Sequence, residues 1–338
     1  MKRLLVVLLA LTVASAVFAG GGGQQSGSST GAGGVTKGMD RKIVMGYSQI
    51  GAESEWRNAN TLNILSAATE YNVDLRFADA MQKQENQIQA IRNFIRQKVD
   101  VIAFTPVVSS GWAAVLSEVK AAKIPTICVD RTIDEGMDSD LFNCFIGSDF
   151  QKEGNNIANW LVNYMKTTGK DQKNPINVVE LQGTVGSAPA TDRQKGFKDV
   201  ISKYPNYKII RSQTGNFTRA EGKQVMEAFL QSDGKDIDVL FAHNDDMAIG
   251  AIQAIQEYGR KPGSDIIIVS VDGVKGAFQA MLDGTLNATQ ECNPLLGGQI
   301  MDTAVKLLTG QKVPKWVVSD EKLYDQSTAA AAFPTRMY

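Results

Sequence analysis

The chain has 338 residues, which leaves room for a leader and two globular domains of about 130–150 residues each. Its 35 basic and 36 acidic side chains give a formal net charge of −1. This balance excludes the strongly basic surface of a typical nucleic-acid-binding protein. His243 is the only histidine, so a catalytic relay or a metal site would have to do without a second one.

Residues 1–19 read as a secretory signal peptide. Lys2 and Arg3 form a basic start, an apolar run follows at 4–13, and a small residue at the end of the stretch predicts cleavage after Ala19. The apolar run is too short for a stable membrane span. Residues 20–39 are mostly Gly, Ser, Gln and Thr and predict a flexible linker. We therefore expect export to the periplasm and a folded part that begins at residue 40.

After residue 40, short apolar runs alternate with amphipathic stretches. The apolar runs predict buried strands at 43–48, 73–78, 101–104, 126–129 and 144–147, and, after a boundary near Ser148-Asp149, at 178–181, 207–211, 239–242 and 266–271. Such alternation is typical of parallel sheets covered by helices on both faces. About ten strands are too many for one small doubly wound unit. We therefore predict two similar doubly wound α/β domains.

The stretch 239–255 carries the clearest sign of a binding site. A buried strand ends in His243, Asn244, Asp245 and Asp246, and a helical pattern follows. In open α/β sheets, ligands bind at the carboxyl ends of strands. One of the two aspartates is expected to cap the helix, which would leave Asn244 free to point into a crevice.

The other predicted strands end in side chains of similar chemistry. These residues are Glu53, Ser54, Trp56, Arg57, Asp130, Arg131, Arg193 and Asp272. Carboxylates and amides form paired hydrogen bonds, arginines supply forked donors, and a tryptophan supplies a flat apolar face. A sugar needs this mixture, because its hydroxyls both donate and accept around a faintly apolar ring.

Each of these residues also has a purely structural interpretation. Asp130 and Arg131 could form a structural ion pair, and Arg193 could be a solvated residue in the first turn of a helix. Trp56 could belong to the core, and Asp272 could serve only in a turn. Binding is favoured because all of them fall at the same ends of successive strands.

Enzymes are the weaker class. The sequence 183–186 follows a strand, but it lacks the third glycine and the lysine of phosphate-binding loops. No serine lies in a nucleophile elbow. Cys128, Cys144 and Cys292 match no zinc spacing. We expect no cofactor, no metal and buried thiols, although a bridge between Cys128 and Cys144 stays possible.

Several long stretches resemble the periplasmic sugar-binding proteins of the ribose/galactose type, and most of all their galactofuranose-binding branch. The matching stretches include GYSQIGAESEWR, IPTICVDR, NVVELQGTVGSAPATDRQKGF and FAHNDDMAIGAIQAI, within a region from Arg41 to about Pro294. The resemblance implies the type I periplasmic binding protein fold, in which two flavodoxin-like (Rossmann-like) doubly wound domains are joined by a hinge. It also implies that the residues named above contact the ligand, and that Phe217 does so as well. Arg57 stands where ribose binders tend to have a second aromatic, which favours a galactofuranose-like sugar. Cys292 replaces a glutamine that ribose binders use.

The resemblance further implies a hinge of three strand crossings, near Ser148-Asp149, Cys292-Asn293 and Val313-Pro314. The expected domains are 40–148 plus 293–314 and 149–292 plus 315–338. The expected function is capture of a monosaccharide between the domains by a monomeric protein, which delivers it to the permease of an ABC importer with its separate ATPase. Another pentose or hexose (ribose, galactose or arabinose), or a sensor role at a chemoreceptor or sensor kinase, stays open. A repressor domain of the same fold is disfavoured by the leader.

Overall fold

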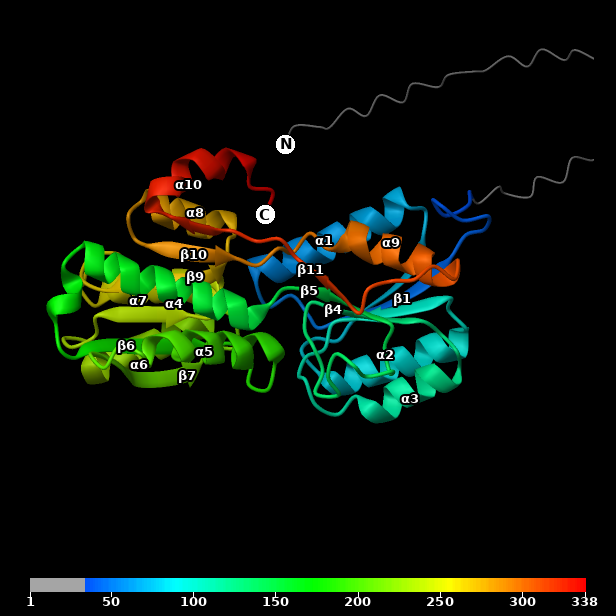
Figure 1. Ribbon diagram of the computed structural model, residues 1–338, viewed down its shortest axis with the longest axis horizontal. Coiled ribbons are helices and arrows are strands. Elements are labelled where there is room, and N and C mark those ends of the chain that lie inside the picture. Colours follow the sequence, from blue (N-terminus) through cyan, green and yellow to red (C-terminus); the bar gives the residue numbers. More distant parts are fainter. Residues whose placement is uncertain (1–33) are drawn as a thin grey trace, which may run out of the picture. The chain divides into compact units, whose positions relative to one another are not determined.

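The computed structural model describes residues 34–338, which form two six-stranded sheets, parallel except for one edge strand, with helices around them (Figure 1). The predicted leader and most of the predicted linker lie outside the described residues. The prediction of two doubly wound α/β units is confirmed. In the described part of the chain, no helix is both long and apolar enough to cross a membrane.

The first sheet has the strand order β11-β5-β4-β3-β1-β2, and all neighbouring strands are parallel. Its strands are β1 (Val44–Gln49), β2 (Asp74–Asp79), β3 (Val101–Phe104), β4 (Thr126–Val129), β5 (Cys144–Gly147) and β11 (Trp316–Val318). Helices α1 (Glu55–Glu70) and α9 (Gly297–Leu308) cover one face, and α2 (Gln84–Gln97) and α3 (Ala113–Ala121) cover the other (Figure 1). Every residue of β3 and β4 is buried, as expected for central parallel strands.

The second sheet has the order β12-β10-β9-β8-β6-β7, with β12 antiparallel at the edge. Its strands are β6 (Ile176–Gln182), β7 (Tyr207–Thr214), β8 (Val239–Ala242), β9 (Ile267–Asp272), β10 (Ala288–Glu291) and β12 (Leu323–Asp325). Its helices are α4 (Phe150–Thr167), α5 (Ala188–Ile201), α6 (Arg219–Asp233), α7 (Asp245–Glu257), α8 (Lys275–Leu282) and α10 (Gln326–Ala332). β10, β11 and β12 were not expected from the sequence, because β11 and β12 have only three residues each and β10, Ala-Thr-Gln-Glu, is not apolar.

The chain passes between the sheets three times. The first two passages follow β5 and β10. The third was expected near Val313-Pro314. However, residues 316–318 still pair with β5, so this passage lies between Val318 and Leu323.

The folded part begins earlier than residue 40. The side chain of Thr36 is fully buried, donates to the carbonyl oxygen of Asn72 at 3.0 Å and accepts from the Ile43 amide at 2.9 Å. Residues 36–39 of the predicted flexible linker therefore belong to the folded unit, because these contacts hold their backbone against the first sheet.

The possible bridge between Cys128 and Cys144 does not form, and the three cysteines are all free. Their strands are neighbours, but Cys144 pairs in register with Ile127 rather than with Cys128. Successive side chains of a strand point to opposite faces. The two thiols therefore lie in different cores, Cys128 with the helices α2 and α3 and Cys144 with α1 and α9.

Candidate functional site

A cavity between the two sheets is lined by all ten residues for which the sequence predicts ligand contacts. It is lined by Glu53, Ser54, Trp56, Arg57, Asp130, Arg131, Pro189, Arg193, Phe217, Asn244, Asp272 and Cys292. It holds about 280 Å³ of space between protein atoms, part of it open to solvent.

The first wall of the cavity is built at the start of α1. Ser54 caps this helix by accepting from the backbone amide of Arg57 at 3.0 Å. The cap fixes the first turn, so that the Arg57 guanidinium reaches Asp130 Oδ2 at 2.6 Å and Glu53 Oε1 at 3.1 Å. Burial alone would raise the pKa of Glu53, but Arg57 and Arg131 hold that pKa below its usual value. The acid therefore stays ionised although it is buried.

Trp56 is held by contacts on its edge and on one face. Its indole N–H donates to the carbonyl oxygen of Cys292 at 2.6 Å, which ties α1 to the second passage between the sheets. The guanidinium of Arg57 lies 4.6 Å from its ring centre, a cation–π contact. Trp56 also packs against the core of the second sheet and is 4% exposed. It is thus both a core residue and a wall of the cavity.

Arg131 has unused hydrogen-bonding capacity. It is 2% exposed, and its Nη1 donates to the carbonyl oxygen of Val107 at 2.9 Å. Its Nε has no hydrogen-bond partner among the described residues. Burial, with Arg57 nearby, lowers the pKa of Arg131 to about 10. A buried donor without a partner costs free energy, so this side chain is suited to a ligand with oxygen acceptors.

The second wall centres on Arg193, in the first half of α5. Its Nε donates to Glu153 Oε2 at 2.7 Å and its Nη1 to the carbonyl oxygen of His243 at 2.6 Å. Asp272 Oδ1 lies 3.6 Å from Nη2. Arg193 is 3% exposed, so the interpretation as a solvated first-turn residue is wrong.

The prediction for Asn244 was wrong in one respect. Asn244 itself caps α7, because its Oδ1 accepts from the Met247 amide at 3.0 Å, while its Nδ2 donates to the carbonyl oxygen of Phe217 at 3.1 Å. Asp245 is buried behind the site and accepts from the amides of Gly273 and Val274 at 2.7 and 2.9 Å. Burial raises the pKa of Asp245 to about 6. Its role in the described structure is to hold the turn that carries Asp272.

Three residues that line the cavity have positive φ angles although they are not glycine. Asp130 has φ 60°, Phe217 has φ 63° and Asp272 has φ 129°. Backbone in this region costs about 1–3 kcal/mol per residue and tends to cluster at functional sites. Burial also raises the pKa of Asp272 well above its usual value. The fold thus retains locally unfavourable geometry at the cavity.

Sequence reasoning missed some members of the site. Pro189 and Cys292 line the cavity, and Glu153 and His243 orient Arg193 from behind it. The signal for Glu153 was weak, because it lies in the first turn of a helix, where an acidic residue is ordinary. Cys292 was expected to be a buried thiol and, from the resemblance, a departure from the glutamine of ribose binders, and it was not counted among the ligand contacts.

The chain belongs to the periplasmic binding protein domain family, whose model matches residues 45–312. Proteins of this family bind their substrates and do not transform them, so the chain is not an enzyme. It is 47% identical over 290 residues to the galactofuranose-binding protein YtfQ of Escherichia coli (strain K12), covering 85% of this chain and 89% of that protein.

Two solved structures resemble it over most of their length. One, from Mycobacterium smegmatis, is a complex with β-D-fucofuranose and has a TM-score of 0.83 at 52% identity, covering 88% of this chain and 95% of the other. The other is the periplasmic binding component of an arabinose ABC transporter from Shewanella sp. ANA-3, bound to α- and β-L-arabinofuranose. It has a TM-score of 0.81 at 49% identity, covering 87% and 95% of the two chains.

Proposed function

We propose that this protein captures a furanose monosaccharide, with a galactofuranose-like sugar favoured, and delivers it to an ABC importer. The observation that carries the proposal is the convergence of ten predicted contact residues on one cavity between the two sheets. The relatives support the ring form, since the three named above bind galactofuranose, fucofuranose and arabinofuranose.

The contacts suggest how the sugar is held. Arg57, Arg131 and Arg193 supply forked donors, and Glu53, Asp130 and Asp272 supply acceptors for hydroxyl groups. Trp56 and Phe217 offer aromatic faces to the ring. A hydroxyl buried without a partner costs about 1–3 kcal/mol, so a sugar with a misplaced hydroxyl binds more weakly. This penalty is the source of selectivity.

Delivery requires that the two units move. Where the loops meet, the Glu55 amide donates to Asp246 Oδ2 at 2.7 Å and the Ser109 amide donates to the Gly186 carbonyl oxygen at 2.8 Å. We infer that these contacts belong to a closed state and that the sugar enters when they open. The closed monomer would then dock on a permease served by a separate ATPase.

Export and domain division belong to the same proposal. Cleavage after Ala19 would release a periplasmic protein that begins at Gly20. The proposed domain division is the one expected from the sequence, 40–148 plus 293–314 and 149–292 plus 315–338. The pairing of β11 with β5 favours moving the last boundary to the segment after Val318.

The test is calorimetric titration of the purified protein with L-arabinose, D-fucose, D-galactose and D-ribose, together with mass spectrometry of co-purified ligand. Sugars with a substantial furanose population should bind, and a co-purified hexose or pentose should appear.

Arg131→Gln should weaken binding about ten- to hundredfold, because it removes the donor that lacks a protein partner. Arg92→Gln, which breaks an exposed pair with Glu118 on α3, is the matched control. Failure of every sugar to bind would overturn the proposal.

A further inference from the structure

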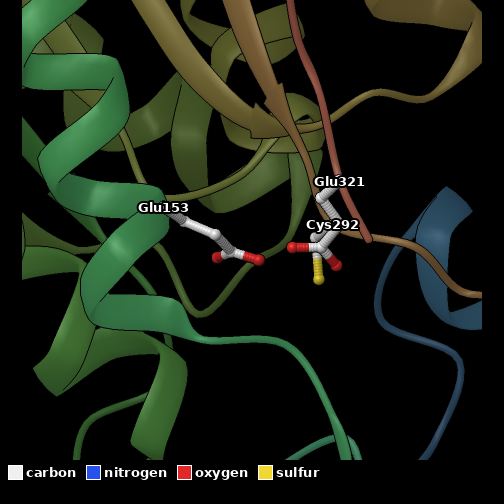
Figure 2. Close-up of side chains that lie close together, drawn as sticks. All are labelled: Glu153, Cys292 and Glu321. Atoms are coloured by element: carbon white, nitrogen blue, oxygen red, sulfur yellow. The ribbon is translucent and has the colours of Figure 1, made fainter. Parts of the chain in front are cut away.

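Three side chains meet where the chain passes between the sheets. Glu153 comes from α4, Cys292 directly follows β10, and Glu321 lies on the third passage (Figure 2). One carboxylate oxygen of each acid and the sulfur of Cys292 all lie within 4.8 Å of one another. Glu153 and Cys292 are buried, and Glu321 is half-buried. The three are far apart in sequence, so no local spacing reveals them.

Only one of the two carboxylate oxygens of Glu153 has a hydrogen-bond partner among the described residues. Its Oε2 accepts from Arg193 at 2.7 Å. Its Oε1 has no hydrogen-bond partner in the described part of the chain, although the residue is only 1% exposed. The carboxylate points toward Cys292 and Glu321 (Figure 2). A buried carboxylate oxygen without a partner is costly, and its direction indicates what could satisfy it.

Glu321 is positioned by the other two passages. Its Oε1 accepts from the Asn293 amide at 2.9 Å and from the hydroxyl of Ser148. The Ser148 hydroxyl also lies 3.4 Å from Cys292 Sγ. These contacts pre-orient a carboxylate and a thiol toward the same point.

We propose that Glu153, Cys292 and Glu321 form a binding site for a thiophilic divalent cation, with Zn²⁺ as the best fit. Three protein ligands and one water are a recognised zinc arrangement, with bonds of about 2.3 Å to sulfur and 2.0–2.2 Å to oxygen. Such bonds place neighbouring ligand atoms about 3–4 Å apart. The side chains therefore need to draw together only slightly.

Charge and access both suit this ion. The deprotonated ligands carry three negative charges, which Zn²⁺ and the Arg193 guanidinium together balance. An adjoining cavity of about 190 Å³, lined by Glu153, Glu321, Lys152 and Asp320 among others, offers a route for the ion and its water. A thiolate ligand favours Zn²⁺ over Mg²⁺ or Ca²⁺.

The experiment uses the full mature chain, stripped with a chelator and free of sugar. ZnCl2 is titrated by calorimetry, and Co²⁺ serves as a spectroscopic probe, since a thiolate ligand gives a charge-transfer band in the near ultraviolet. We expect one Zn²⁺ per chain. Cys292→Ser should lose the cobalt band, and both Cys292→Ser and Glu321→Gln should bind Zn²⁺ at least about tenfold more weakly.

Asp320→Asn is the matched control, because Asp320 lines the same cavity but lies outside the cluster. It should bind Zn²⁺ as the wild type does. Melting curves in chelator show whether each variant is folded. If Cys292→Ser does not fold, the result for Glu321→Gln decides the test. The proposal fails if the wild type takes up no Zn²⁺, or if the Glu321 variant binds it undiminished. Since no sugar is present, this result is independent of the proposed transport function.

Discussion

Arg57 is the residue on which the choice of sugar depends most. It contacts Glu53, Asp130 and the face of Trp56 at once. Arg57→Phe would keep a ring against Trp56 but would leave two buried carboxylates with fewer donors. We expect affinity for a galactofuranose-containing ligand to fall about ten- to hundredfold and ribose affinity to fall less. Calorimetry with both sugars measures the difference.

Arg57→Lys is the matched control for this prediction. It keeps the positive charge but loses the forked geometry, so its affinity should lie between those of the wild type and Arg57→Phe. An unchanged affinity of Arg57→Phe for the galactofuranose ligand would make Arg57 a bystander in recognition.

His243 should make the protein sensitive to acid. Its ring is fully buried, with Nδ1 accepting from the Gly183 amide at 3.3 Å, so Nε2 carries the proton that faces Glu180 Oε1 at 3.2 Å. Burial lowers the pKa of His243. Below about pH 6.5, His243 therefore binds a proton in the unfolded state but not in the folded state. The free energy of unfolding falls as the pH drops below this value.

Urea unfolding between pH 8 and pH 5 tests this expectation. The slope from one such group is at most about 1.4 kcal/mol per pH unit. His243→Gln should be less stable than the wild type at pH 8 but should lose less stability on acidification. Equal slopes for both proteins would show that His243 does not titrate on unfolding.

At the scale of elements, the close contact of α4 and α5 positions Arg193. Gly154 and Gly196 face each other across this contact, and a Cβ added at Gly196 would lie 2.1 Å from the carbonyl oxygen of Gln151. Gly196→Ala should therefore separate the helices. We expect a loss of about 1–3 kcal/mol in the free energy of unfolding, together with weaker sugar binding through displacement of Arg193.

Gly298→Ala provides the control for this contact. Gly298 lies inside α9, and a Cβ there would meet nothing within 4 Å. Alanine at a free helical position should stabilise by about 0.5–1 kcal/mol. Chemical denaturation measures the free energy of unfolding of both variants. Equal changes for Gly196→Ala and Gly298→Ala would contradict the close packing of α4 against α5.

For the whole molecule, we predict compaction on binding sugar. Three short passages join the two units, and such connections allow hinge closure. Small-angle scattering should give a smaller radius of gyration with the bound sugar than without it. A sugar that calorimetry shows not to bind is the control. An unchanged radius would indicate a cleft that stays closed.

The sequence by itself determined the two-unit fold and nine of the residues that line the cavity. Both follow from rules that act locally: parallel strands buried on both faces require continuous apolar runs, and ligand contacts fall at the carboxyl ends of those strands. Arg57, Asp130 and Asp272 could be named because each lies directly after a strand or in the first turn of the next helix. The resemblance then supplied Phe217, which no local pattern marks.

Only the tertiary structure decided how these residues are paired. It showed that Asn244 caps its own helix, that the thiols of Cys128 and Cys144 lie on opposite faces of one sheet, and that β11 remains with the first sheet. It also brought Glu153, Cys292 and Glu321 together. Hydrogen bonds, register and side-chain clusters depend on segments distant in sequence. Their geometry is therefore set by packing, which no local periodicity records.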